Sequence, residues 1–311
     1  MTVARFDDRV AVVTGAGRGL GRAYAQLLAE RGANVVVNDH GGNLAGDGAD
    51  AAPAGQVVDG IRAAGGEAVA CTASVATRDG AAAIVRTALE RYGRIDVLIH
   101  NAGNVRPASL NEMEYEDFDA VLEVHLRGAF NVVRQAFPVM CRAGYGRIVL
   151  TSSIGGLYGN RNVANYAAAK AGVIGLSNVV ALEGAADGVT CNVIVPAAVT
   201  RMAEGIDTSA YPPMGPELVA PVVGWLAHES CSVSGEMFVA LAGRVARAVI
   251  AESPGVCRPS WTIEDVGEHF DAIRNIEAPL IFPVLPDGHA EHIRYSFGLA
   301  HRSNDRGALH G

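Results

Sequence analysis

The chain has 311 residues, of which half are hydrophobic, 19% are charged and 6% are aromatic, which is typical of a folded globular protein and excludes a disordered one. With 25 Lys and Arg against 33 Asp and Glu, the formal net charge is −8, the wrong sign for a protein that neutralises a nucleic-acid backbone. The five cysteines are odd in number and form no C-x-x-C pair, so neither a disulfide framework nor a metal site is expected.

Short β-branched runs alternate with helical segments through the first two thirds of the chain. We expect strands at residues 9–14, 34–39, 67–72, 95–100, 147–152 and 190–196, and helices at 20–31, 56–64 and 80–92, within 116–143 and within 164–186. The strand cores are apolar on both faces, as in parallel strands that helices cover on both sides. The pattern therefore predicts the α/β class, with a doubly wound (Rossmann) parallel sheet between two helix layers.

Two segments depart from this alternation. Residues 41–55 are rich in Gly, Ala and Asp and indicate a surface loop. After about Gly243 the alternation stops, and we expect one helix at 262–275 and fraying of the last ten residues. The predicted organisation is a Rossmann-fold domain at 1–243 and a C-terminal extension at 244–311 that packs on the same domain or on a neighbouring subunit.

The chain carries no segment that suggests a membrane. Asp7 and Asp8 stand near the start without an apolar signal core, and no run of about 18 apolar residues occurs. We expect a cytoplasmic protein without a membrane or nucleic-acid partner.

A glycine-rich turn follows the first strand. Gly15, Gly17, Gly19 and Gly21 lie between that strand and a helix, where a backbone can approach a pyrophosphate and the helix dipole favours negative charge. Asp39 ends the next strand, where an acid bonds the adenosine ribose. Its charge disfavours the 2′-phosphate of NADP, whereas Arg18 would attract it. We weigh the carboxylate more heavily and predict NAD as the cofactor.

Tyr166 and Lys170 are one helical turn apart and share a helix face. Lys170 is the only lysine beside 24 arginines, and Lys differs from Arg as a compact, titratable ammonium. At about 4 Å such a charge would lower the pKa of the phenol by roughly three units, toward 7. The alternative is a surface tyrosine that stacks on a lysine stem.

Further polar residues follow the strand ends. Ser153 comes after the fifth strand, at the sheet edge where ligands bind, and its neighbour Ser152 could instead be the one that only caps the turn. Asn101, Ala102 and Gly103 close the fourth strand, and Pro196 closes the sixth.

Taken together, these motifs resemble the short-chain dehydrogenase/reductase family over about residues 5–243. The resemblance rests on Thr14-Gly-x-x-x-Gly19-x-Gly21, Asn101-Ala-Gly, Ser153, Tyr166-x-x-x-Lys170 and Pro196 with Thr200. It implies hydride transfer between a nicotinamide and a carbinol or carbonyl carbon, with Tyr166 as acid/base, Ser153 positioning the oxygen and Lys170 binding ribose. The cofactor-binding residues that it implies are Gly15, Arg18, Gly19, Leu20, Gly21, Asp39, Ser74, Val75, Asn101, Ala102, Gly103, Tyr166, Lys170, Pro196, Val199 and Thr200.

The sequence also departs from the family pattern. His125 stands where the family has Asn; it either anchors a proton-relay water in that catalytic position or only packs. Ser74 stands where an Asp often contacts adenine, and Ala197 replaces a Gly.

Within the family, the segments around Asn38-Asp39, Val124–Gly128 and Trp225–Cys231 resemble (3R)-hydroxyacyl-CoA dehydrogenase units of peroxisomal multifunctional enzymes. That resemblance implies oxidation of a bulky 3-hydroxyacyl-CoA, with a steroid-derived acyl part as one option, by a homodimer or homotetramer. Arg106, Arg161 and Arg201 are candidates for CoA recognition. The alternatives are a dehydrogenase of free hydroxysteroids and a nucleotide-sensing protein without chemistry. His289-x-x-His292 has metal-like spacing but lacks a third ligand, so we expect no metal.

Overall fold

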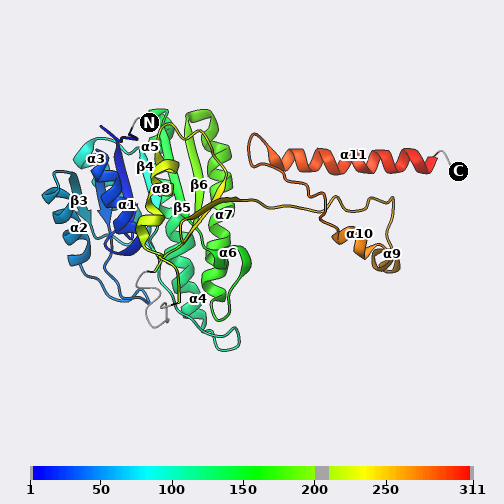
Figure 1. Ribbon diagram of the computed structural model, residues 1–311, viewed down its shortest axis with the longest axis horizontal. Helices are drawn as coiled ribbons and strands as arrows, with labels where there is room; N and C mark the ends of the chain where they lie inside the picture. Colours follow the sequence, from blue (N-terminus) through cyan, green and yellow to red (C-terminus); the bar gives the residue numbers. More distant parts are fainter. Residues whose placement is uncertain (1–2, 200–209, 309–311) are drawn as a thin grey trace. The chain divides into compact units, whose positions relative to one another are not determined.

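The computed structural model describes residues 3–199 and 210–308. It divides the chain into two units, Met1–Arg247 and Ala248–Gly311, which Figure 1 draws in sequence colours.

The first unit is built on a sheet. In the described part of the chain, eight strands form this sheet in the order β3-β2-β1-β4-β5-β6-β7-β8. The strands are β1 (Val10–Thr14), β2 (Asn34–Asn38), β3 (Glu67–Cys71), β4 (Val97–His100), β5 (Gly146–Thr151), β6 (Val189–Ala197), β7 (Met237–Leu241) and β8 (Arg244–Ala248). Strands β1 to β7 pair in parallel. The strand order reverses between β1 and β4, and such a switch point leaves a crevice at the carboxyl ends of the strands.

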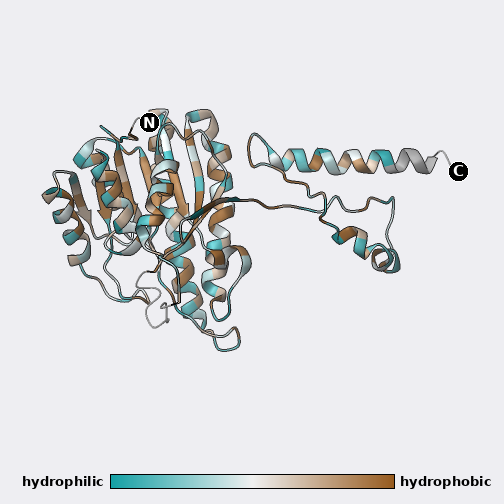
Figure 2. Ribbon diagram, in the orientation of Figure 1, coloured by the Kyte–Doolittle hydropathy of each residue, from teal (hydrophilic) through white to brown (hydrophobic). Residues whose placement is uncertain are grey.

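Helices cover the two faces of the sheet, as the alternating pattern predicts. The helices are α1 (Gly19–Glu30), α2 (Ala52–Ala63), α3 (Arg78–Tyr92), α4 (Tyr115–Leu122), α5 (Gly128–Ala143), α6 (Ile154–Tyr158), α7 (Ala164–Gly184) and α8 (Ala220–Ala227). Contacts of α1 with α2 and α8 form one layer, and contacts of α5 with α3 and α7 form the other. The apolar strands between them are the brown centre of Figure 2, and the side chains of β1 and β4 are completely buried.

The last two strands form a hairpin that the sequence analysis did not predict. Ala242 and Gly243 both have positive φ, 48° and 79°, which is the conformation that a two-residue hairpin turn requires. Strand β8 therefore turns back beside β7 at the sheet edge, and the first unit extends to Arg247, within this strand.

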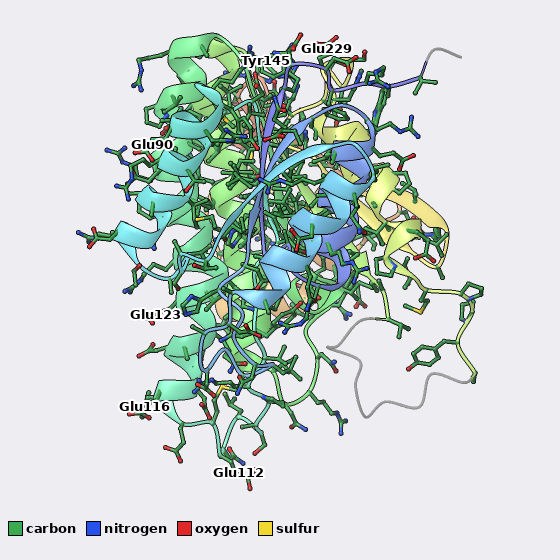
Figure 3. The ribbon with its side chains drawn as sticks, turned by 90° about the vertical axis from the view of Figure 1, so that its left-hand side faces the viewer. Glu90, Glu112, Glu116, Glu123, Tyr145 and Glu229 are labelled. Atoms are coloured by element: carbon green, nitrogen blue, oxygen red, sulfur yellow. The ribbon has the colours of Figure 1, made fainter. Side chains whose placement is uncertain are left out.

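An aromatic and ionic cluster lies at the amino ends of the strands. The Tyr145 ring sits between two guanidinium groups, with the Arg9 and Arg147 carbons 4.0 and 4.4 Å from its centroid. Arg9 also pairs with Asp96 and Glu229. Figure 3 shows Tyr145 and Glu229 at the end of the unit opposite Glu112 and Glu116, so this cluster is remote from the crevice and serves the fold.

The second unit contains α9 (Ile263–Glu268), α10 (Phe270–Arg274) and α11 (Gly288–Ala308). A capping box between Thr262 and Asp265 starts α9, and His269 separates it from α10, so the single helix expected at 262–275 is two short ones. The 21-residue helix α11 was not predicted, and it includes residues 302–308 of the end that we expected to be frayed. Across the described residues, no helix combines the length and the apolar character that crossing a membrane takes.

Candidate nucleotide and catalytic site

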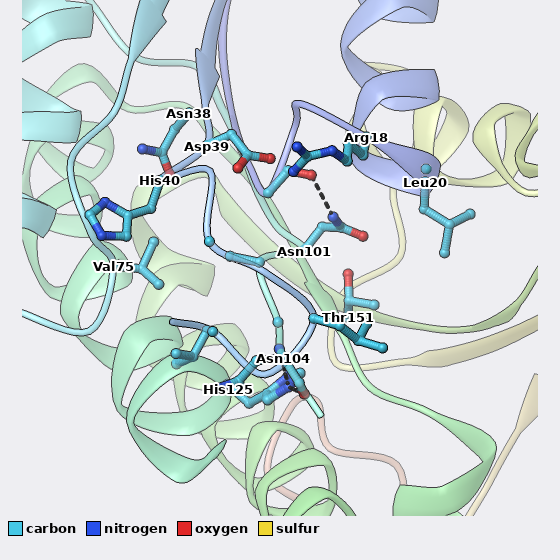
Figure 4. A pocket seen from close by; sticks show the side chains of 18 of the residues that line it. Arg18, Leu20, Asn38, Asp39, His40, Val75, Asn101, Asn104, His125 and Thr151 are labelled. Atoms are coloured by element: carbon cyan, nitrogen blue, oxygen red, sulfur yellow. Dashed lines mark hydrogen bonds between the residues drawn. The ribbon is translucent and has the colours of Figure 1, made fainter. Parts of the chain in front are cut away.

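A pocket of about 350 Å³ opens at the carboxyl ends of the strands. Its wall comes from the glycine-rich turn, the end of β2 and the loop after it, the loop after β4, the end of β5, α7 and the end of β6. Figure 4 shows Arg18, Asp39 and Asn101 around one part of this pocket and Asn104 with His125 around another. The pocket therefore lies at the switch point of the sheet.

The glycines of the turn make close approaches that a side chain would prevent. A Cβ on Gly15 would lie 2.7 Å from Cα of Ala102, and Gly15 has a φ of 63°. A Cβ on Gly21 would lie 2.2 Å from the carbonyl oxygen of Gly15. Gly15, Gly19 and Leu20 line the pocket, whereas Gly21 lies behind the wall and gives the turn its space. No side chain in the described residues caps α1 at Arg18, so the helix N-terminus faces the pocket with free donors.

Asp39 joins the turn to the loop after β2. Its carboxylate accepts hydrogen bonds from the backbone N–H of Gly17 at 2.8 Å and of Gly41 at 2.7 Å. Asp39 and Arg18 both line the pocket. The carboxylate is thus fixed at the wall where a ribose would be expected.

Thr14 and His100 form a buried junction beneath the turn, which the sequence analysis missed. The Thr14 hydroxyl oxygen accepts the backbone N–H groups of Asn101 and Ala102, at 3.1 and 3.2 Å, and lies 3.1 Å from Nδ1 of His100. Because that oxygen already accepts two hydrogen bonds, its own proton goes to Nδ1, and His100 carries its proton on Nε2. Burial lowers the pKa of His100 from 6.5 to about 3. The ring is therefore neutral and joins the end of β4 to β1, while the Thr14 hydroxyl joins β1 to the loop after β4.

Tyr166 and Lys170 meet at the pocket wall, as their spacing predicts. The Lys170 Nζ lies 5.6 Å from the Tyr166 ring centroid and donates to the Thr151 carbonyl at 2.6 Å. Burial lowers the pKa of Lys170 from 10.5 to about 7. Burial also raises the pKa of Tyr166, and the Ser153 side chain partly opposes this by hydrogen bonding.

The pKa of Tyr166 is thus raised, whereas the sequence analysis expected a fall toward 7. The phenol loses hydration, and the ammonium points to a carbonyl rather than to the phenol oxygen. In this structure the lysine is the group of the pair whose pKa comes near neutrality.

The two adjacent serines have different contacts. The Ser152 hydroxyl donates to the carbonyl of Lys170 at 2.7 Å and holds α7 against β5. The Ser153 hydroxyl accepts from the N–H of Gly155 at 3.1 Å and caps α6. Ser153 therefore caps a helix and also interacts with Tyr166, although it lies outside the pocket wall.

His125 lies in a π-helical turn, η1 (Glu123–Arg127), between α4 and α5. The single helix expected within 116–143 is interrupted there, and π turns are frequent at functional sites. The His125 ring packs edge-on against Tyr166 at 5.1 Å, and its Nε2 lies 2.8 Å from the carbonyl oxygen of Asn104. A Cβ on Gly103 would lie 2.3 Å from the ring, so this glycine makes room for it. Burial lowers the pKa of His125 well below 6.5, and the ring is neutral.

The remaining expected residues divide into three groups. Ser74, Val75, Asn101, Ala102, Gly103 and Pro196 line the pocket. Val199 is exposed and its N–H donates to the carbonyl of Met214 at 2.7 Å, away from the wall. Thr200 and Arg201 lie outside the described residues.

The loop after β2 lies at the surface, as expected, and it also forms part of the pocket wall. Gly41, Gly42, Asn43, Leu44 and Gly46 line the wall. The sequence held one signal for this, because a loop that leaves the carboxyl end of a strand beside the switch point starts at the ligand crevice.

Two observations test whether the wall suits a dinucleotide. Gly15 lines the pocket with backbone alone, because a Cβ there would collide with Ala102. Among the described residues, buried Oδ1 of Asn104, Nδ1 of His125 and Oγ1 of Thr151 have no hydrogen-bond partner, and all three residues line the pocket. Buried polar atoms ordinarily have partners, so the wall suits a polar ligand.

The residues around His289 and His292 do not form a metal site. Nowhere in the described ranges do three or more His, Cys, Asp or Glu side chains gather around a common point. Both histidines lie in α11, and His292 pairs with Glu252 at 3.1 Å.

The chain is similar to known dehydrogenases. Residues 9–209 match the short chain dehydrogenase family model. Over 82% of its length the chain is 52% identical to peroxisomal multifunctional enzyme type 2 of Drosophila melanogaster, and over 76% it is 46% identical to peroxisomal hydratase-dehydrogenase-epimerase of Saccharomyces cerevisiae. It covers 43% and 26% of these two proteins, so it spans less than half the length of either relative.

A solved structure agrees with the fold. The full-length Drosophila melanogaster multifunctional enzyme type 2 matches 96% of this chain with a TM-score of 0.78 and 39% identity, and the match covers 51% of that chain. The family match, the order of the strands in the sheet and the glycine-rich turn all point to the same family. The chain therefore belongs to the short-chain dehydrogenase/reductase family.

Proposed function

We propose that this protein oxidises a 3-hydroxyacyl-CoA to the 3-oxoacyl-CoA with NAD as the acceptor. The observation that carries the proposal is the meeting of Tyr166 and Lys170 with the glycine turn and Asp39 in one pocket. A protein that only sensed a nucleotide would have no use for a buried lysine with a near-neutral pKa beside a phenol.

The dinucleotide would be held from both sides of the switch point. Backbone donors of the turn and the α1 terminus suit the pyrophosphate, and Asp39 suits the adenosine ribose. Its negative charge favours NAD over NADP. Ser74 and Val75 would contact the adenine end, while Asn101, Pro196 and Lys170 stand toward the nicotinamide end.

The chain's own groups would manage the proton. A bound oxidised nicotinamide would supply the hydride acceptor and a positive charge that would favour the Tyr166 phenolate. Tyr166 takes the hydroxyl proton as the substrate carbon becomes a carbonyl, and Ser153 orients the substrate oxygen. Lys170 exchanges a proton near neutral pH because its pKa is about 7. His125, neutral and packed on Tyr166, fixes the ring.

The substrate class is supported by the names of the relatives, which describe multifunctional and hydratase-dehydrogenase enzymes. The acyl part is proposed to be bulky, with a steroid-derived chain as one option. Arg106 does not suit CoA recognition, because Asp47 and Asp117 already engage its guanidinium at 2.6 and 2.8 Å. The exposed Arg161 stays a candidate for the CoA phosphates.

The test follows NADH absorbance with a panel of 3-hydroxyacyl-CoA thioesters of increasing acyl size and, in parallel, with free hydroxysteroids, each with NAD and NADP. Turnover of the thioesters with NAD supports the proposal. Turnover of free steroids alone would contradict the substrate, and faster reaction with NADP at equal low concentration would contradict the cofactor.

Two further assignments are also proposals. Assembly as a homodimer or homotetramer is tested by light scattering on the purified chain. The relatives carry peroxisomal names, which makes the peroxisome an alternative to the cytoplasmic location that the sequence suggested, and cell fractionation distinguishes the two.

A further inference from the structure

The loop after β2 crosses the nucleotide pocket. We define the strap as residues 41–47. It begins at the carboxyl end of β2, and its far end bonds to the loop that follows β4. Because β1 lies between β2 and β4 in the sheet, the strap must pass in front of β1 and its glycine turn. Strap residues and turn residues line the same pocket, which therefore lies between them.

Backbone and side-chain bonds fasten the far end of the strap. The N–H of Val105 donates to the carbonyl of Leu44 at 3.0 Å. The Asn104 side chain donates to the carbonyl of Ala45 at 3.2 Å, and Nε of Arg106 donates to the same carbonyl at 2.9 Å. A second guanidinium nitrogen of Arg106 binds the carboxylate of Asp47 at 2.6 Å.

Arg106 connects the strap to the rigid part of the unit. Its third guanidinium nitrogen binds Asp117, in the first turn of α4, at 2.8 Å. The Asn165 side chain, at the start of α7, bonds the carbonyl oxygens of both Arg106 and Asp117. The Arg106 side chain is 24% exposed, so water screens these contacts only in part. A planar fork with five donors can make all three contacts at once, which a lysine cannot.

We propose that Arg106 is a positioning residue for the cofactor, which fastens the strap across the pocket so that the dinucleotide enters and leaves only when the strap lifts. This inference rests on the proposed function, because it takes the pocket to be the dinucleotide site. It assigns Arg106 to control of cofactor exchange, and the hydride-transfer step does not depend on this residue.

The test measures NADH association and release by stopped-flow fluorescence in the full chain. Arg106→Met removes all three guanidinium contacts and should speed both association and release by about tenfold, since charge-assisted bonds are the stronger kind. Arg106→Lys keeps the positive charge, and its rate constants should lie between those of wild type and those of Arg106→Met. Asp47→Asn should reproduce part of the effect, because it weakens the strap side of the junction alone.

A matched control separates the strap from a general loss of a surface ion pair. Arg91→Met breaks the exposed pair with Glu67 at 3.0 Å, on α3 and β3, and should leave both rate constants unchanged. Urea unfolding of each variant checks that the fold is intact. If the folded Arg106→Met protein exchanged NADH at the wild-type rates, or released it faster with unchanged association, the proposal would be overturned.

Failure of the proposed function looks different. If the wild-type protein neither bound NADH nor turned over any hydroxyacyl thioester, the proposed dinucleotide site itself would be contradicted. Wild-type protein that turns over the thioester with NAD, beside an Arg106→Met variant with unaltered exchange rates, would overturn the strap alone.

Discussion

The buried histidine beneath the glycine turn makes a prediction about acid stability. His100 is neutral in the folded protein, with Nδ1 accepting the Thr14 hydroxyl, and its pKa falls from 6.5 to about 3 because it is buried. In the unfolded chain the ring regains an ordinary pKa. Between the two values the unfolded chain binds more protons than the folded one, so stability is lost as the pH falls from about 6.5 toward 3.

The size of the loss follows from the two pKa values. Each pH unit below 6.5 costs about 1.4 kcal/mol per such histidine, so His100 alone removes about 2 kcal/mol between pH 7 and pH 5. His125 shifts in the same direction and adds to the slope. An Asn at position 100 can still accept the Thr14 proton but does not titrate in this range. His100→Asn should therefore reduce the loss between pH 7 and pH 5 by about 2 kcal/mol.

Urea unfolding at pH 7, 6 and 5, followed by circular dichroism, measures these slopes. The variant is expected to start somewhat less stable at pH 7, because its smaller side chain leaves space, and to lose less on acidification. His289→Asn, which replaces an exposed histidine, is measured beside it as the matched control. An equal loss for wild type and His100→Asn between pH 7 and pH 5 would refute the reasoning.

The remaining predictions concern the cofactor wall. Gly21→Ala places a methyl 2.2 Å from the Gly15 carbonyl oxygen and should weaken NADH binding at least about tenfold by displacing the turn. The control Gly60→Ala, with open space around it in the described residues, should add about 0.5–1 kcal/mol of stability. Similar NADH affinities for the two variants would contradict this prediction. Asp39→Ala removes the acceptor of two backbone N–H groups and should weaken NAD binding roughly 10- to 100-fold in calorimetry while improving relative use of NADP; an unchanged NAD-to-NADP ratio speaks against the ribose role. Lys170→Arg inserts a group that cannot deprotonate and should lower turnover about 100-fold or more. It should also abolish the change of turnover rate with pH around pH 7. If that pH dependence remained, another group would be the one that titrates.

Much of the fold follows from the sequence because parallel strands between helix layers must be apolar on both faces. The runs that became β1 and β2 have that character throughout, and the glycine turn between β1 and α1 is local in sequence. The spacing of Tyr166 and Lys170 likewise fixes one helix face. These features depend only on residues that are close together in the sequence, and the periodicity of the sequence therefore predicts them.

Other features depend on partners far apart in the sequence. The sequence of the strap indicates only an ordinary loop, because Arg106, which holds it, lies about 60 residues later in the chain. His100 looks like one more residue of a strand end, and only the doubly accepting Thr14 hydroxyl fixes its tautomer. The π turn at His125, the burial of the Tyr166 phenol and the direction in which Lys170 points are also set by tertiary packing. Because burial raises the pKa of Tyr166, the expected fall was wrong for this structure.

Tyr166→Phe is the most direct test of the central claim, because it removes one oxygen and leaves the ring against His125. NADH binding by fluorescence titration and turnover of a 3-hydroxyacyl-CoA with NAD are measured on the same preparation. We expect nucleotide affinity within about threefold of wild type and a turnover lower by a factor of about 10² to 10⁴. A variant that binds NADH normally and still oxidises the thioester at a rate near that of wild type would contradict the account.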